Sequence, residues 1–142
     1  MRSLLLAVIG CLLAGCTTAT DGPTANTASR DLSDPAASAI AGDMVGRLAE
    51  QVGPGINKVK WNEDATPFGQ AMEAALKAWG YEVVTEQGID EKMPMVALTY
   101  GVDDLEGQAL VSISAGSVEL ARAYVTSATG ASPASPVSVR RN

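Results

Sequence analysis

Histidine is absent from the 142-residue sequence, and cysteine occurs only at Cys11 and Cys16. Without histidine the chain lacks the commonest general base and the commonest metal ligand. Two cysteines near one terminus cannot supply the clustered Cys and His ligands of a zinc site. Serine, threonine and lysine are present, but none comes with a recognisable activating base. We therefore predict a protein that is not an enzyme and that holds no metal and no cofactor other than a covalent lipid.

Positive charge is also scarce, because 10 basic side chains stand against 16 acidic ones and the net charge is −6. Direct nucleic-acid binding needs a basic surface, so we expect no nucleic-acid partner. We also expect no small-molecule substrate. Gly53-Pro54-Gly55 lacks the spacing of a phosphate loop and is interpreted as a helix stop. Asp103 and Asp104 are neighbours whose side chains point apart, unlike a catalytic carboxylate pair, and we predict a solvated turn there.

The first fifteen residues have the features of an export signal. Arg2 is positive, and residues 4–14 form an almost unbroken apolar run. That run is shorter than the roughly 20 residues that a membrane-spanning helix needs. It closes in a tetrapeptide that resembles the lipobox of bacterial lipoproteins: Leu13, Ala14, Gly15 and Cys16. We predict that 1–15 is a signal peptide cut after Leu13-Ala14-Gly15, and that Cys16 is lipidated.

The lipobox resemblance implies two or three acyl chains, palmitate among them, on Cys16. A single acyl chain holds a protein only marginally, so several would make a lasting membrane anchor. Inner-membrane lipoproteins usually carry Asp after the cysteine, and Thr17 stands there instead. By resemblance to the known lipoprotein sorting rule, Thr17 favours an anchor at the periplasmic face of the outer membrane. Residues 16–33 are rich in Thr, Ala and Ser and predict a flexible tether.

Two amphipathic helices are predicted in the next part of the chain. Asp34-Pro35 gives an N-cap and a first helical residue, and apolar residues follow at intervals of four: Ile40, Met44, Leu48 and Val52. Thr66-Pro67 repeats that start, and Gly80 is a natural helix end. The second apolar stripe contains Phe68, Met72, Ala75, Leu76 and Trp79. We predict that Trp79 lies in the core. For Trp61, on a short strand that could be an edge, core and exposed positions both stay open.

Strand patterns dominate the second half of the sequence. Residues 81–84 form one short candidate strand. Apolar residues then recur at every second position over 96–102, 108–115 and 118–126. The turns at 103–107 and 116–117 are short, which requires antiparallel pairing. We predict an α+β domain over 34–126. It would consist of a small antiparallel sheet of three to five strands with two helices packed on one face.

Arg122 and Tyr124 share one face of the last predicted strand. Arginine and tyrosine are favoured in interface hot spots, so a partner contact is possible here. The competing interpretation is a partly buried arginine paired with an acidic neighbour such as Glu82 or Asp103.

Residues 127–142 are predicted to form an extended C-terminal tail. Val137 and Val139 alternate with Ser138 and Arg140, which suits a short added strand and a second possible partner contact. We expect the tail to stay unpaired until a neighbouring subunit accepts it. In the alternative, it folds back on its own sheet and places Arg140 or Arg141 near the acidic turn at 103–104.

Together these features resemble the TrbH family of conjugal transfer lipoproteins. The resemblance rests on the lipobox, Ala78-Trp79-Gly80-Tyr81, Leu98-Thr99-Tyr100 with Ala109-Leu110-Val111, Leu120-Ala121-Arg122-Ala123-Tyr124, Gly130, Pro133 and Val139-Arg140. It implies a structural lipoprotein of a conjugative type IV secretion apparatus that serves mating-pair formation and plasmid transfer. Its partners would be the membrane, through the lipid, and protein subunits of the outer-membrane core complex. The alternative is a stand-alone periplasmic binding lipoprotein, such as an exclusion or inhibitor protein.

Overall fold

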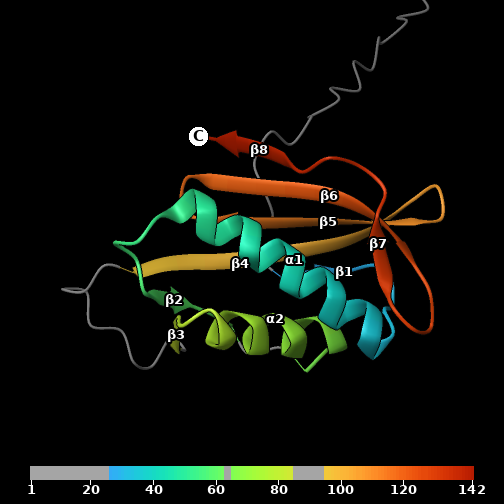
Figure 1. The fold of residues 1–142 in the computed structure, drawn as a ribbon, viewed down its shortest axis with the longest axis horizontal. Helices are drawn as coiled ribbons and strands as arrows, with labels where there is room; N and C mark the ends of the chain where they lie inside the picture. The colour runs from blue at the N-terminus through green and yellow to red at the C-terminus, as the bar shows by residue number, and fades with distance from the viewer. Residues whose placement is uncertain (1–25, 63–64, 85–94) are drawn as a thin grey trace, which may run out of the picture.

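The computed structural model describes residues 26–62, 65–84 and 95–142. Two helices and eight strands follow one another along the chain (Figure 1). Their bounds are β1 Thr27–Ala28, α1 Asp34–Val52, β2 Lys58–Lys60, α2 Pro67–Ala78, β3 Glu82–Val84, β4 Met95–Leu105, β5 Gln108–Ala115, β6 Val118–Thr126, β7 Ala131–Pro133 and β8 Ser138–Arg141. The predicted signal peptide, the lipobox and the start of the tether lie outside the described residues.

All eight strands belong to one mixed sheet in which the order is β3-β2-β4-β5-β6-β7. The predicted meander is confirmed, because β4, β5 and β6 pair antiparallel. At one edge, β2 runs parallel to both β3 and β4, and β1 also runs parallel to β4. At the other edge, β7 and β8 pair with β6 one after the other. The prediction of a small antiparallel sheet of three to five strands is therefore wrong.

Three of the short strands match candidates in the sequence: β2 lies beside Trp61, β3 lies within 81–84, and β8 overlaps the alternating residues 137–140. β1 and β7 were not predicted, because each is very short. β1 has two residues and β7 has three. A period of two needs more residues than that to stand out from a turn. The parallel edge also has a topological cause. α2 connects β2 to β3, and a helix that crosses over brings the next strand back in the same direction.

The helix starts are set by side-chain caps. Ser33, one residue before the predicted cap, accepts a hydrogen bond from the backbone N–H of Ala36 at 3.2 Å. Asp34 therefore lies in the first turn, where a negative charge complements the helix dipole. Thr66 caps α2 as predicted and accepts from the N–H of Gly69 at 3.0 Å. Gly53 and Gly80, with φ of 80° and 92°, follow the two helices in a backbone conformation that glycine adopts freely.

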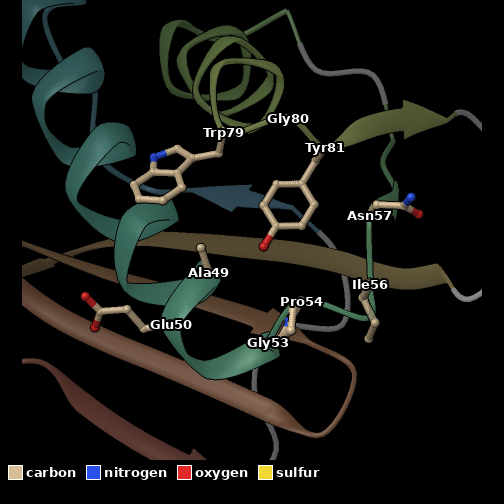
Figure 2. Close-up of a pocket in the computed structure, with 9 residues that line it drawn as sticks. All are labelled: Ala49, Glu50, Gly53, Pro54, Ile56, Asn57, Trp79, Gly80 and Tyr81. Carbon is tan, nitrogen blue, oxygen red and sulfur yellow. The ribbon is translucent and has the colours of Figure 1, made fainter.

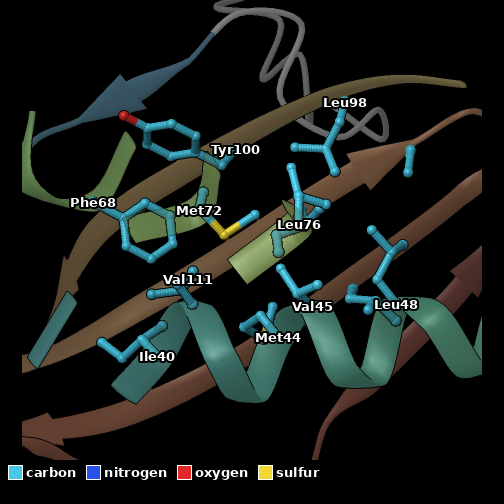
Figure 3. Packing of buried hydrophobic residues seen from close by; sticks show 14 of the residues in the cluster. Ile40, Met44, Val45, Leu48, Phe68, Met72, Leu76, Leu98, Tyr100 and Val111 are labelled. Carbon is cyan, nitrogen blue, oxygen red and sulfur yellow. The ribbon is translucent and has the colours of Figure 1, made fainter. Parts of the chain in front are cut away.

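The core lies between the two helices and one face of the sheet (Figure 3). Side chains from α1 and α2 meet there with side chains from the central strands, among them Ile40, Met44, Leu48, Phe68, Met72, Leu76, Leu98, Tyr100 and Val111. Tyr100 lies between two other aromatic rings. It stacks on Trp61 at 5.8 Å between ring centroids and meets Phe68 edge-on at 4.8 Å.

The two tryptophans correct the sequence interpretation. Trp61 is 1% exposed and belongs to the core. Trp79 is 56% exposed, so the prediction that it lies in the core is wrong. α2 ends at Ala78, and Trp79 is its C-cap, where the indole lies against Gly46 of α1 and outside the core. The apolar stripe predicted for the second helix therefore includes one residue too many, and its last buried member is Leu76.

Residues 26–33 are attached to the sheet. Asn26 accepts a hydrogen bond from the N–H of Tyr100, and β1 pairs with Gly101 and Val102. Arg30 reaches across to Asp104 and Thr126. Asp104 lies in β4, because the predicted turn at 103–107 is shorter than expected and its positive φ angles fall on Glu106 and Gly107. A flexible tether can therefore extend only over the residues that precede Asn26.

The C-terminal tail folds back on its own sheet as β7 and β8. The expectation that it stays unpaired is therefore wrong. Its arginines also lie elsewhere than the alternative proposed. Arg140 pairs with Glu119, and Arg141 donates to the backbone and side-chain oxygens of Gln51 at the end of α1. Within the described residues, no helix has both the length and the apolar character needed to cross a membrane.

Candidate protein-binding surfaces

Arg122 and Tyr124 meet on Asp43, a residue of α1. One oxygen of the Asp43 carboxylate accepts from Arg122 Nη1 at 2.9 Å and from the Tyr124 hydroxyl at 2.6 Å. Arg47 lies one helical turn further along, 3.8 Å from the other carboxylate oxygen. Arg122 also donates through Nε to the carbonyl oxygen of Ser135 at 2.8 Å. We call these residues the Asp43 cluster; it ties α1, β6 and the segment between β7 and β8 together.

Burial gives the Asp43 cluster its strength. Tyr124 is 1% exposed, and desolvation raises the pKa of its hydroxyl above the ordinary value, as does the hydrogen bond to the Asp43 carboxylate. The tyrosine is therefore a neutral donor at any physiological pH. Hydrogen bonds to a charged acceptor stabilise a fold more than neutral ones do.

Sequence reasoning placed Arg122 and Tyr124 on one face but missed Asp43 and Ser135. The alternative interpretation, an arginine paired with an acid, is the one that the structure shows, with Asp43 in place of Glu82 or Asp103. A signal was present in the sequence. Asp43 borders the apolar stripe of the helix beside Met44, where its side chain is 27% exposed, and a partly buried acid needs a polar partner.

The four predicted partner contacts differ in accessibility. Tyr124 is buried, and Arg122 is partly buried in the Asp43 cluster. Val137 packs partly against the core. Val139 on β8 is 42% exposed and is the most accessible of the four. A partner-binding role for these residues stays a prediction, and Val139 is the member that a partner could reach without displacing internal contacts.

Cys16 and the cleavage motif at Leu13, Ala14 and Gly15 lie outside the described residues. Over 26–62, 65–84 and 95–142, no group of three or more Cys, Asp or Glu side chains is placed to hold a metal ion. Asp103 and Asp104 bind Ser29 and Arg30 respectively, which gives both carboxylates a role in attaching the N-terminal segment.

A pocket of about 450 Å³ opens where α1 and α2 end (Figure 2). We call it the helix-end pocket; it is lined by Ala49, Glu50, Gly53, Pro54, Ile56, Asn57, Trp79, Gly80 and Tyr81. The Trp79 indole lies over α1, and the Tyr81 hydroxyl points toward the end of that helix. Gly46 makes room for the indole, because a Cβ at this position would lie 3.2 Å from Trp79 Cζ2.

The helix-end pocket combines aromatic surface with negative potential. Two helices end at its wall, and a helix C-terminus carries a partial negative charge of about half an elementary charge. The last turn of α1 contains no basic residue, although Arg141 reaches the Gln51 carbonyl from β8. The last turn of α2 contains Lys77, which pairs with Glu73 at 3.0 Å.

Glu50 adds a carboxylate at the rim of the pocket. The guanidinium of Arg47 forms an ion pair with this carboxylate at 4.0 Å. Burial raises the pKa of Tyr81, so its hydroxyl is neutral.

Comparison with known proteins gives one consistent result. The family model described as "Conjugal transfer protein TrbH" matches residues 18–142. The chain is also similar to the "Probable conjugal transfer protein TrbH" of Sinorhizobium fredii (strain NBRC 101917 / NGR234), with 45% identity over 144 residues. That alignment covers 98% of this chain and 97% of the relative. The match extends over the whole described domain, and the chain belongs to the TrbH family of conjugal transfer proteins.

Proposed function

We propose that this chain is a non-enzymatic, lipid-anchored structural subunit of a conjugative type IV secretion apparatus, held at the periplasmic face of the outer membrane. Membership of the TrbH family supports a role in conjugative transfer. The observation that carries the finer proposal is the tetrapeptide Leu13-Ala14-Gly15-Cys16 directly after an apolar run. Thr17 after the cysteine favours the outer membrane.

The described domain supports a binding role rather than a catalytic one. The sequence contains no histidine, and among the described residues the groups with a shifted pKa are two tyrosines kept neutral by burial. A general base is expected to have a pKa near the operating pH instead. The acidic composition favours protein partners over nucleic acid.

The mechanical argument concerns the way in which the domain is tied to the anchor. Asn26, the first described residue, binds β4, and Arg30 then fixes this segment to β4 and β6. Force on a membrane anchor before residue 26 would therefore reach the centre of the sheet. Such a domain can act as a rigid unit that links a membrane to protein subunits.

Lipidation is tested by Cys16→Ser, with Cys11→Ser as the matched control inside the signal peptide. We expect Cys16→Ser to leave the outer-membrane fraction and Cys11→Ser to remain there. Mass spectrometry of the wild-type N-terminal peptide should show the lipid on Cys16. A wild-type protein without lipid mass, or a Cys16→Ser protein that fractionates unchanged, would contradict the anchor.

The structural role is tested by deletion of the gene in a donor strain. We expect loss of DNA donation, restored by the wild-type gene and not by Cys16→Ser. Normal donation with altered recipient behaviour would instead favour a stand-alone exclusion or inhibitor protein.

A further inference from the structure

We propose that the helix-end pocket is the docking site for an arginine side chain, flanked by an apolar residue, that another protein of the transfer apparatus presents. The inference deepens the proposed function and rests on it for the source of the partner. The chemistry of the occupant is argued from the pocket itself.

The exposed indole of Trp79 marks a recognition surface. Tryptophan is enriched among the few residues that carry most of the energy of protein interfaces. At 56% exposure, Trp79 is the largest of the exposed apolar side chains in the described part of the chain. It also borders a pocket of about 450 Å³, which is large enough to accept a whole side chain.

Charge selects a cation as the occupant. Glu50 and the C-terminal end of α1, whose last turn has no basic residue, make the pocket negative, and the net charge of −6 adds a field of the same sign. An acidic segment would be repelled. A guanidinium can stack on the face of Trp79 while it donates hydrogen bonds to a carboxylate, and an ammonium lacks that planar shape.

The remaining wall requires an apolar neighbour. Pro54 and Ile56 line the pocket on the side opposite Trp79, together with the ring of Tyr81 (Figure 2). Asn57 and the Tyr81 hydroxyl are the polar groups on this side, and neither carries a charge. A segment in which a leucine or a similar residue adjoins the arginine would fill both halves of the pocket at once.

The pocket is also separate from the internal contacts of the fold. Trp79 packs on Gly46, a position without a side chain, and more than half of its surface is exposed. Glu50 is a surface residue, and its ion pair with Arg47 is long, at 4.0 Å. Both side chains can be changed without opening the core, which makes the proposal testable.

The binding test uses the lipidated protein in detergent micelles with 5-fluorotryptophan at its two tryptophans. Acetyl-Leu-Arg-Leu-amide is the probe, and the same peptide with citrulline, which is neutral and nearly isosteric, is its control. We expect the Trp79 fluorine resonance to shift saturably and that of Trp61 to stay constant. Loss of the guanidinium charge should weaken binding about tenfold.

Variants locate the site. Trp79→Ala should abolish the binding of the arginine peptide, as followed by calorimetry, and Glu50→Gln should weaken it about threefold or more. Val125→Ala removes an equally exposed apolar side chain elsewhere and should have no effect. Equal binding of the citrulline peptide, no saturable binding, or unchanged binding to Trp79→Ala would each overturn the proposal.

Conjugation assays separate this inference from the proposed function. We expect Trp79→Ala donors, with normal protein level and membrane location, to transfer DNA about tenfold less often than Val125→Ala donors. Loss of transfer on gene deletion with full transfer by Trp79→Ala would refute the docking site and leave the structural role intact. Normal transfer after gene deletion would refute the structural role, whereas the peptide measurements would still decide the chemistry of the pocket.

Discussion

Trp61 and Trp79 each directly follow a secondary-structure element, β2 and α2, yet one is 1% exposed and the other 56%. Trp61 comes directly after β2. Its backbone N–H continues the sheet by donating to Val84, and its ring stacks on Tyr100. Trp79 follows α2, at a point where α1 offers only the bare backbone of Gly46. Whether a large aromatic side chain is buried depends on which element covers it, and its local pattern does not contain that information.

The difference extends to the regions around the two residues. Around Trp61 the helices and the sheet form a closed core. Around Trp79 the same two helices end and leave the helix-end pocket. The first region holds the fold together, and the second is free to bind. Four predictions, from the largest expected effect to the smallest, test this division.

Trp61→Ala should have the largest effect. Deletion of a buried large aromatic side chain costs about 3–5 kcal/mol. A domain of this size has about 5–15 kcal/mol of stability in total, so the variant should be marginal. Urea denaturation followed by far-UV circular dichroism measures the change. Trp61→Phe is the control, because it keeps a ring beside Tyr100 and removes an indole N–H that has no partner among the described residues. A stable Trp61→Ala domain would place the core elsewhere.

Truncation after Gly130 should come second. It removes β7 and β8, the Arg140 and Arg141 contacts and the Ser135 carbonyl that Arg122 binds. Several hydrogen bonds at about 0.5–1.5 kcal/mol each suggest a loss of roughly 2–4 kcal/mol in the free energy of unfolding. Arg140→Ala is the control. It breaks one surface ion pair and keeps the strand, so it should cost under about 1 kcal/mol. An unchanged melting temperature after truncation would mean that the tail is not an integral part of the sheet.

The sequence predicted the parts of the fold in which one pattern runs for many residues. Both helices and the three long strands were correct, because eight or more residues repeat one period. Among the short edge strands, β1 and β7 were missed, and the parallel pairing of β2 with β3 and β4 was not predicted, since it depends on the strands that lie beside each. The local sequence of a short strand does not say which strand of the sheet it will pair with.

The candidate sites show the same limit. Arg122 and Tyr124 were correctly placed on one face, yet their partner, Asp43, lies about eighty residues earlier in the chain. The helix-end pocket was not predicted, because it forms only where tertiary packing brings the ends of the two helices together. The lipobox needs no tertiary context, which is why the sequence alone suggests it.

Tyr124→Phe should have the third-largest effect, and its effect should depend on pH. The variant loses a hydrogen bond to the Asp43 carboxylate, worth about 1.5–3 kcal/mol. Because the pKa of Tyr124 is raised in the folded state, this stabilisation is fully present below the ordinary tyrosine pKa of 10.0 and is lost as the pH rises above it. Denaturation of both proteins between pH 7 and 11 should show the difference shrinking above pH 10. A constant difference would mean that the hydroxyl ionises equally in both states.

Trp79→Ala should have the smallest effect on stability, although it changes the same residue type as the first prediction. Exposed substitutions usually change the free energy of unfolding by about 0.5 kcal/mol or less, and loss of the contact with Gly46 can raise this to about 1 kcal/mol. Circular dichroism in urea, beside Trp61→Ala under the same conditions, measures the contrast directly. A cost of about 3 kcal/mol or more would mean that part of the chain covers the indole in solution, and a covered indole could not receive an arginine from a partner. A cost near zero with lost binding of the arginine peptide would separate the two regions by experiment: Trp61 maintains the fold, and Trp79 works only when a partner is present.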